Sequence, residues 1–326
     1  MGDGIETDVM KADPGHGAAE AAAGGKRLLD AVGNTPLLDL ARVARDVPGL
    51  RLLAKAEFMN PGGSVKDRPA RAMLADGLAR GLLTPGKRIL EATSGNTGIA
   101  DAMLGRALGF GVTLCVPAKA SVERKAILAA FGAELVLTDP LEGADGAIRM
   151  AREMFARDPD KYFYPDQYSN PANWRAHFET TGPEIWRDTA GALTHFVAGL
   201  GTTGTFVGVT RYLKSRSAEV QCVSMQPDGP IHGLEGMKHM GSQMIPRIYD
   251  PTLADAELTV GTEESYAMCR RLAREEGVFV GPSAAANVVA ALCVARETPA
   301  PATIVTVLCD GGGKYLSQTI WQGSGP

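Results

Sequence analysis

The segment Asn60-Pro-Gly-Gly-Ser-Val-Lys-Asp-Arg68 places a lysine where a turn passes into a helix. Asn-Pro-Gly-Gly favours a turn, and a helical pattern runs from Pro69 to Arg80. A lysine at the start of a helix lies near the positive end of the macrodipole, which disfavours its charged form and lowers its pKa. Lys66 is therefore a candidate amine nucleophile of the kind that forms Schiff bases. A solvated lysine in the first helical turn is the alternative.

A second polar segment, Glu91-Ala-Thr-Ser-Gly-Asn-Thr-Gly98, lies between an expected strand and an expected helix. Backbone N–H groups at a helix start bind anions, and neighbouring hydroxyl and amide side chains add donors. Thr93, Ser94, Asn96 and Thr97 together suit a carboxylate. Simple capping of the helix by Ser94 or Asn96 is the alternative.

A third segment, Gly199-Leu-Gly-Thr-Thr-Gly-Thr205, follows an expected strand. Its glycines allow the backbone to approach a phosphate closely, and its threonines supply hydroxyl donors. It lacks the Gly-Lys-Ser/Thr of a P-loop, and no acidic residue follows at a convincing ribose-binding position. The segment therefore fits a phosphate monoester better than a dinucleotide.

Two further polar side chains stand at the ends of expected elements. Ser283, in Val280-Gly-Pro-Ser-Ala-Ala-Ala286, enters a helix and is either its N-cap or a ligand contact. Asp310, in Cys309-Asp-Gly-Gly-Gly-Lys-Tyr315, follows a strand and either caps the turn or approaches a ligand.

Alternating buried strands and amphipathic helices must position these segments. The expected strands are Arg88–Glu91, Val112–Val116, Glu134–Leu137, His195–Ala198, Val220–Met225 and Thr303–Leu308. The expected helices are Asn96–Leu108, Ser121–Phe131, Ala144–Ala156, Thr205–Leu213, Glu263–Glu276 and Ser283–Ala295. This alternation predicts an α/β fold with parallel-rich sheets flanked by helices, and ligands at the carboxyl ends of the strands.

Composition narrows the class of protein. A chain of 326 residues with 45% hydrophobic and 21% charged residues predicts an ordinary globular core. The net charge of −4 argues against nucleic acid and anionic membranes as partners. No apolar run is long enough to span a bilayer, and no signal-peptide pattern opens the chain. The five cysteines form no CxxC and no Cys/His metal cluster, so we expect buried thiols, no metal and a cytoplasmic location.

In their order along the chain, these segments resemble the fold-type II pyridoxal phosphate enzymes, specifically the cysteine synthase and cystathionine β-synthase family. The resemblance runs from about Leu28 to about Trp321 and includes Gln167–Asn173 and Thr180–Trp186. It implies a tryptophan synthase β-like fold of two α/β domains. The smaller domain is expected at residues 59–166 and the larger at 26–58 plus 167–326, with residues 1–25 as a disordered tail.

The resemblance also implies roles for individual residues. Lys66 is expected to carry pyridoxal 5′-phosphate as a Schiff base, and Asn96 to hydrogen-bond the 3′-oxygen of the cofactor. Ser283 matches the serine that faces the pyridine nitrogen. The substrate carboxylate is expected at Thr93, Ser94, Thr97 and Gln167. The phosphate is expected at Gly201, Thr202, Thr203, Gly204 and Thr205.

The reaction implied is β-replacement on an O-activated serine. A sulfur nucleophile adds to an α-aminoacrylate to give L-cysteine, Lys66 acts as the base, and a homodimer is the expected assembly. Replacement with another nucleophile, giving cystathionine or 2,3-diaminopropionate, is the first alternative. A non-catalytic regulatory homologue is a second, and a nicotinamide oxidoreductase is a third, suggested only by the glycine-rich turn.

Two departures bear on the substrate. Gly-Thr-Thr-Gly-Thr and the segment His232–Met240 resemble cysteine synthase B-type and O-phosphoserine sulfhydrylase-like proteins, in which a basic residue meets the leaving phosphate. Lys238 is the nearest match here, although lysine lacks the bidentate fork of arginine; a surface lysine is the alternative. Asp310 stands where many cysteine synthases have serine, so its effect on the cofactor is open. O-acetylserine and O-phosphoserine both remain candidate substrates.

Overall fold

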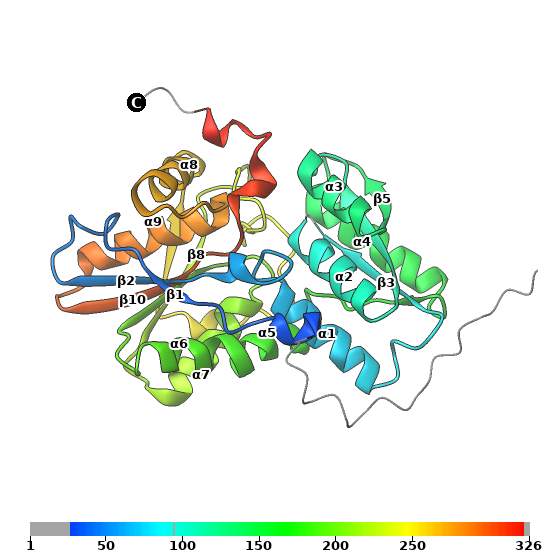
Figure 1. The fold of residues 1–326 in the computed structure, drawn as a ribbon, viewed down its shortest axis with the longest axis horizontal. Coiled ribbons are helices and arrows are strands. Elements are labelled where there is room, and N and C mark those ends of the chain that lie inside the picture. The colour runs from blue at the N-terminus through cyan, green and yellow to red at the C-terminus, as the bar shows by residue number, and fades with distance from the viewer. Residues whose placement is uncertain (1–26, 94, 323–326) are drawn as a thin grey trace, which may run out of the picture.

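Two separate β-sheets organise the chain (Figure 1). The computed structural model describes residues 27–93 and 95–322. The expected disordered tail, residues 1–25, and the candidate anion ligand Ser94 lie outside this part of the chain.

The larger sheet has six strands, and its centre is formed by segments far apart in sequence. Its order is β1 (Leu37–Asp39), β2 (Leu50–Lys55), β10 (Ala302–Val307), β7 (His195–Gly199), β8 (Gln221–Pro227) and β9 (Ala256–Val260). Only the β1–β2 pair is antiparallel. Strand β2 runs parallel to β10 over its whole length, so an early and a late segment of the chain lie side by side.

The smaller sheet is entirely parallel. Its order is β5 (Glu134–Thr138), β4 (Gly111–Pro117), β3 (Arg88–Ala92) and β6 (Tyr162–Phe163). All of its strands come from the range predicted for the smaller domain, and the strands of the larger sheet come from outside it. We propose the two sheets as the centres of the two predicted domains.

The helices follow the predicted order with small differences at their ends. The longer ones are α1 (Asp67–Ala79), α2 (Asn96–Ala107), α3 (Val122–Ala130), α4 (Gly143–Arg157), α5 (Pro171–Ala176), α6 (Gly182–Asp188), α7 (Gly204–Arg216), α8 (Thr262–Arg271) and α9 (Pro282–Glu297). Single turns are η1 (Leu28–Ala31), η2 (Glu57–Met59), η3 (His177–Thr181), η4 (Pro251–Leu253), η5 (Leu272–Glu276), η6 (Gly312–Tyr315) and η7 (Thr319–Trp321). The helix expected over Glu263–Glu276 is interrupted, because its last five residues form a π-helical turn.

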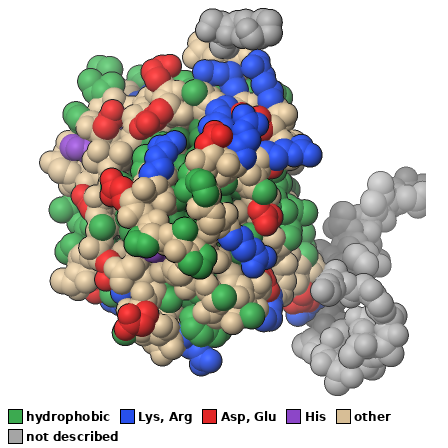
Figure 2. Space-filling model, turned by 90° about the vertical axis from the view of Figure 1, so that its left-hand side faces the viewer, with side chains coloured by type: hydrophobic (Ala, Val, Ile, Leu, Met, Phe, Trp, Pro, Cys, Tyr) green, Lys and Arg blue, Asp and Glu red, His purple; other side chains and the backbone are tan. Residues whose placement is uncertain are grey.

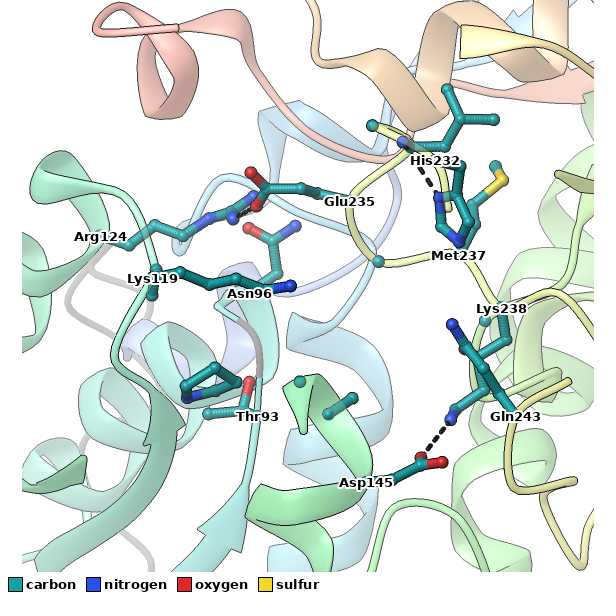
Figure 3. Close-up of a pocket in the computed structure, with 18 of the residues that line it drawn as sticks. Thr93, Asn96, Lys119, Arg124, Asp145, His232, Glu235, Met237, Lys238 and Gln243 are labelled. Carbon is teal, nitrogen blue, oxygen red and sulfur yellow. Dashed lines mark hydrogen bonds and ion pairs between the residues drawn. The ribbon is translucent and has the colours of Figure 1, made fainter. Parts of the chain in front are cut away.

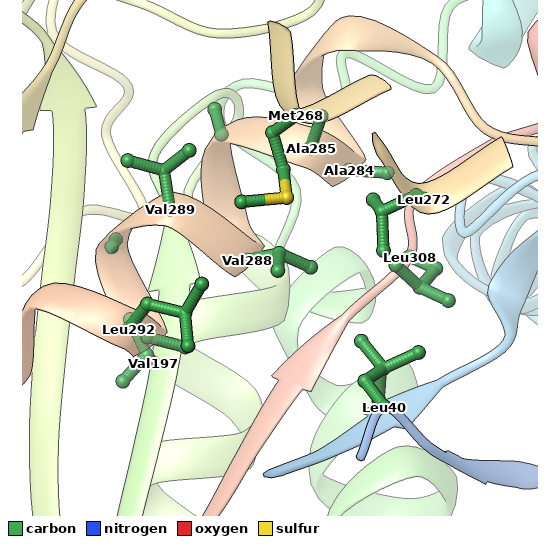
Figure 4. Close-up of a cluster of buried hydrophobic side chains, with 14 of the residues drawn as sticks. Leu40, Val197, Met268, Leu272, Ala284, Ala285, Val288, Val289, Leu292 and Leu308 are labelled. Atoms are coloured by element: carbon green, nitrogen blue, oxygen red, sulfur yellow. The ribbon is translucent and has the colours of Figure 1, made fainter. Parts of the chain in front are cut away.

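Each face of the larger sheet is covered by helices (Figure 1). Because side chains alternate along a strand, Leu52 and Ile304 face the cluster built with α8 and α9, whereas Leu53 and Val305 face the cluster built with α6 and α7. Figure 4 shows the first cluster, in which the short side chains of Ala284 and Ala285 lie among larger residues. A helix that is apolar on nearly all sides, such as α9, is typical of a buried helix.

The smaller sheet is covered in the same way. Ile89 of β3 packs in a cluster with side chains of α1, α2 and α3, and the adjacent Leu90 packs in a cluster with side chains of α4. Within the described residues, no helix is long and apolar enough to cross a membrane. On the face shown in Figure 2, acidic and basic side chains are interspersed, with Lys and Arg denser toward one edge.

Candidate active site

A cavity of about 800 Å³ collects most of the predicted site residues. This volume is in the range of small-molecule sites. Its walls come from the start of α1, the β3–α2 junction, the β7–α7 junction and the loop after β8. The predicted residues that line it are Lys66, Thr93, Asn96, Thr97, Gln167, Gly201, Thr202 and Lys238. Figure 3 shows several of these side chains facing one another across the cavity.

Lys66 is the residue immediately before α1, at the helix N-terminus, as its sequence context predicted. Its backbone N–H donates to Ser64 Oγ at 3.2 Å, while its side chain lines the cavity and is half-buried. Burial lowers the pKa of Lys66, and the nearby Cys309 and Asp310 oppose that shift. Desolvation is the main cause of the lowered pKa. The half-buried side chain does not fit the alternative of a fully solvated first-turn lysine.

The β3–α2 junction forms a nest of donors at a helix N-terminus. The N-cap of α2 is Gly95, so capping by Asn96 is excluded. Thr93 Oγ1 accepts hydrogen bonds from the backbone N–H groups of Gly95 at 3.0 Å and Gly98 at 3.2 Å, which fixes the turn. The first N–H groups of a helix lack intrahelical acceptors, so this junction can bind an anion.

Gln167 reaches the same junction from the chain after β6. Its Oε1 accepts a hydrogen bond of 2.7 Å from the Thr97 hydroxyl, and its Nε2 donates to the Ala92 carbonyl at 2.7 Å. Its backbone N–H donates to Glu91 Oε2 at 3.2 Å. Both ends of the Gln167 amide and its backbone are thus held by the β3–α2 junction, as expected of residues that bind one group together.

The Gly201–Thr205 loop connects β7 to α7 and is tightly enclosed. A Cβ at Gly201 would collide with the Gly236 carbonyl oxygen, and a Cβ at Gly204 would collide with Asn173 Oδ1. Thr203 adopts a left-handed backbone with φ of 71°, which is uncommon for a residue with a branched side chain. Glycine is therefore required at two positions, and the loop is held in one shape.

The hydroxyl groups of this loop and its position at a helix N-terminus fit a bound phosphate. Thr203 Oγ1 is buried and has no hydrogen-bond partner among the described residues. A buried hydroxyl is normally satisfied, and here it lies at the N-terminus of α7, where anions bind favourably. Thr205 Oγ1 lies 3.3 Å from His177 Nε2, and burial lowers the pKa of His177 well below its usual value, so that histidine is neutral.

Ser283 lies in the first turn of α9, and Gly281 is the N-cap, so Ser283 as the capping residue is excluded. The Ser283 side chain is buried, and the Cys309 thiol near it accepts a hydrogen bond of 3.3 Å from Asn287 Nδ2. Burial raises the pKa of Cys309 to about 11, so it is a neutral thiol at pH 7. The Cys309 carbonyl accepts a hydrogen bond of 2.8 Å from the backbone N–H of Val65, the residue before Lys66, so Cys309 lies beside the Lys66 turn.

Asp310 is fully buried and contacts the cofactor-site candidates directly. Its Oδ2 accepts hydrogen bonds of 2.7 Å from both Asn96 Nδ2 and the Tyr315 hydroxyl. Lys314 Nζ donates to the other end of the Asn96 amide at 2.8 Å. Tyr315 and Lys314 were not predicted as site residues, because the sequence shows them only as the end of a glycine-rich turn.

Lys238 is buried, so its description as a surface lysine is wrong. Its Nζ lies 3.1 Å from Asp145 Oδ1 of α4 and 5.3 Å from the centre of the Tyr168 ring (Figure 3). Across the cavity, Arg124 of α3 forms an ion pair with Glu235 of the loop after β8. Two ion pairs thus join that loop to the smaller sheet's helices at the mouth of the cavity.

Comparison with known proteins decides the family. The model of the family described as "Pyridoxal-phosphate dependent enzyme" matches residues 28–310. The chain belongs to this family. It is 50% identical over 299 residues to a protein named cysteine synthase from Aquifex aeolicus, covering 90% of this chain and 91% of that protein.

Solved structures of the family are similar over nearly their whole length. An O-ureido-L-serine synthase superimposes with a TM-score of 0.87 at 37% identity, covering 92% of this chain and 96% of the other. A cysteine synthase from Entamoeba histolytica superimposes with a TM-score of 0.86 at 33% identity, covering 98% and 96%. The predicted fold-type II architecture is thereby confirmed, and the chain is a pyridoxal phosphate-dependent enzyme.

Proposed function

We propose that the chain converts an O-activated serine and sulfide into L-cysteine by β-replacement. The observation that carries the proposal is the meeting of three features on one cavity. These are the amine of Lys66, a carboxylate nest at the β3–α2 junction, and a phosphate-binding loop at the β7–α7 junction. Similarity to a protein named cysteine synthase over most of both chains supports the same reaction.

Pyridoxal phosphate would be held at three points. Its phosphate would fit the Gly201–Thr205 loop, where the Thr203 hydroxyl has no partner in the part of the chain that the structure describes. Its aldehyde carbon would meet the Lys66 amine, and its ring nitrogen would meet the Ser283 hydroxyl in the first turn of α9. When bound, the cofactor supplies an electron-withdrawing ring that acidifies the substrate α-carbon. Because Ser283 is a neutral partner, the ring nitrogen is not held as a cation, which favours prompt loss of a β-leaving group.

The chain's own residues would bind the substrate and move its proton. Thr93, Thr97 and Gln167 hold the α-carboxylate at the β3–α2 junction. Burial lowers the pKa of Lys66, which increases the fraction of neutral amine able to take the α-proton. The Cβ–O bond then breaks with departure of the leaving group, sulfide forms the Cβ–S bond, and Lys66 returns a proton to Cα.

We propose O-acetylserine as the preferred substrate. The ammonium of Lys238, the group expected to meet a leaving phosphate, is already balanced by Asp145 at 3.1 Å. O-phosphoserine would have to compete with that carboxylate, and it is the second candidate. The sulfur nucleophile also has alternatives, since a structurally similar family member is an O-ureido-L-serine synthase.

We also propose a homodimer in the cytoplasm. The family resemblance supports the dimer, and light scattering of the purified protein tests it. All five cysteines are free thiols, which suits a reducing compartment.

The proposed function is tested with purified protein. We expect a yellow protein whose visible band is bleached by borohydride with covalent fixation of the cofactor at Lys66. Incubation with O-acetylserine and sulfide should release L-cysteine and acetate in equal amounts, and Lys66→Ala should release neither. Cysteine formation by Lys66→Ala at the wild-type rate would refute the role of Lys66. A yellow wild-type protein that forms no cysteine from either O-acetylserine or O-phosphoserine would refute the reaction.

A further inference from the structure

The Asn96 amide is held at both ends by groups of opposite charge. Its Oδ1 accepts a hydrogen bond of 2.8 Å from Lys314 Nζ, and its Nδ2 donates to Asp310 Oδ2 at 2.7 Å. The two ends of an asparagine amide are a pure acceptor and a pure donor. A flipped amide would face a cation with its NH₂ and an anion with its oxygen, so only one orientation is compatible with these neighbours.

Lys314 is an ammonium in this position. Its Nζ has three oxygen acceptors, the Gly62 carbonyl at 3.2 Å, the Gly63 carbonyl at 2.9 Å and Asn96 Oδ1. A neutral amine has two protons to donate and an ammonium has three. The side chain is 8% exposed, and a buried charge persists only when it is paired and hydrogen-bonded. Burial lowers the pKa of Lys314, and the nearby side chains of Asp310 and Asp67 oppose that shift by favouring its charged form.

The same ammonium joins two parts of the site. Gly62 and Gly63 belong to the turn that precedes Lys66, and Asn96 opens α2. Lys314 itself belongs to η6, near the end of the chain, and its carbonyl accepts a hydrogen bond of 3.1 Å from Ser121 Oγ, the N-cap of α3. One buried side chain therefore fixes the turn before the nucleophile relative to the amide.

We infer that Lys314 is a positioning residue that, together with Asp310, locks the Asn96 amide so that its second Nδ2 proton is available to the 3′-oxygen of the cofactor. The inference rests on the role proposed for Asn96. It adds that Asn96 cannot perform this role alone, since an asparagine amide free to rotate presents its oxygen as readily as its NH₂.

The test compares Asn96→Ala, Lys314→Met and the double variant, all without substrate. The readouts are the position of the visible band and the dissociation constant of pyridoxal phosphate. We expect each single variant to shift the band in the same direction and to weaken cofactor binding about fivefold, as for one net hydrogen bond of ~1 kcal/mol. The double variant should lose no more than either single one, because both remove the same contact. Lys87→Met is the matched control, at a partly exposed lysine that bonds only the Pro159 carbonyl among the described residues.

A wild-type band and wild-type affinity in Lys314→Met would overturn the inference, as would losses that multiply to about 25-fold in the double variant. If Lys314→Met does not fold, Asp310→Asn removes the charge at the other end of the amide. It should shift the band as Asn96→Ala does, and an unshifted band would be equally decisive. Tyr315→Phe, which leaves both Asn96 contacts in place, should retain the wild-type band. A failure of the proposed reaction would show instead as normal cofactor binding without cysteine formation.

Discussion

The hydroxyl of Thr97 donates a hydrogen bond to Oε1 of Gln167, with the two oxygens 2.7 Å apart. This contact fixes the amide that reaches the carboxylate nest. Replacing Thr97 by the isosteric valine leaves a buried acceptor unpaired, which costs about 1–3 kcal/mol. We expect Thr97→Val to raise KM for the amino-acid substrate about tenfold, with a smaller change in kcat. Steady-state kinetics with Thr298→Val as control tests this, and an unchanged KM would contradict it.

A substitution at Gly204 tests whether the shape of the phosphate loop is needed for cofactor binding. A side chain there would collide with Asn173 Oδ1, whose amide nitrogen donates to Thr202 Oγ1 at 3.1 Å. Gly204→Ala must therefore displace the loop, and we expect cofactor affinity to fall about tenfold, or ~1.4 kcal/mol. Gly229→Ala is the control, because a Cβ at that position meets no atom within 4 Å. Equal cofactor retention by the two variants after dialysis would show that the loop tolerates the added methyl group.

Lys238 and Asp145 test the choice of leaving group. If Lys238 meets a departing phosphate, Lys238→Ala should lower kcat/KM for O-phosphoserine about tenfold while sparing O-acetylserine. Asp145→Asn releases the ammonium of Lys238 from its partner. It should therefore raise kcat/KM for O-phosphoserine relative to that for O-acetylserine. Both ratios are measured by competition between the two substrates. If each variant changes kcat/KM equally for the two substrates, the Lys238–Asp145 ion pair only joins α4 to the loop after β8.

The ion pairs of Arg68 predict how the free energy of unfolding depends on pH. It lies between Glu57 and Glu184, with nitrogen–oxygen distances of 2.7 Å to each. Burial alone would raise the pKa of Glu184, but Arg68 and Lys55 lower it from 4.5 to about 2. The stability gained from this carboxylate is therefore present above about pH 4.5 and is lost as pH falls toward 2.

Glu184→Gln should lower the free energy of unfolding by about 3 kcal/mol at pH 7, because it removes a partner from a buried ion pair. The variant should also lose less stability than wild type between pH 4.5 and 2. Urea unfolding at several pH values measures both effects. Identical slopes of stability against pH in the two proteins would rule out the assignment.

The buried carboxyl group of Asp101 predicts the opposite pH dependence of the free energy of unfolding. Both of its carboxylate oxygens are buried without hydrogen-bond partners among the described residues, and burial raises its pKa from 3.8 to about 8. Folding must therefore protonate Asp101, and stability falls as pH rises from about 4 to about 8. We expect Asp101→Asn to raise Tm by a few degrees at pH 8 and little at pH 4. Asp76→Asn, at a partly exposed aspartate paired with Arg80, serves as control. An equal gain at both pH values for Asp101→Asn would contradict the protonation.

Local pattern predicted most of the parallel strands, because buried parallel strands are continuous apolar runs. It did not predict β2, whose sequence Leu50-Arg-Leu-Leu-Ala-Lys55 carries two cations. Buried Lys55 is paired with Glu184, 134 residues beyond the strand's start, at 2.7 Å, and with Asp188 at 3.4 Å. A partner so distant in sequence is not visible in the strand itself.

The candidate site shows the same limit. Residues of turns that open helices, such as Lys66 and Thr203, were predicted because turn chemistry is local. Lys314 was not, because its role depends on acceptors near residues 62 and 96 that the fold brings to it. Side chains that act through distant partners require the tertiary structure.

The pairing of β2 with β10 also bears on how the protein is made. A ribosome releases residues 50–55 long before residues 302–307, their parallel neighbours. The smaller sheet, complete by residue 163, has all its strands early in synthesis. The centre of the larger sheet cannot close until residues 302–307 have emerged, so the growing chain carries an unpaired strand edge until then. A nonsense mutation before codon 302 would thus leave β2 and β7 without the strand that lies between them.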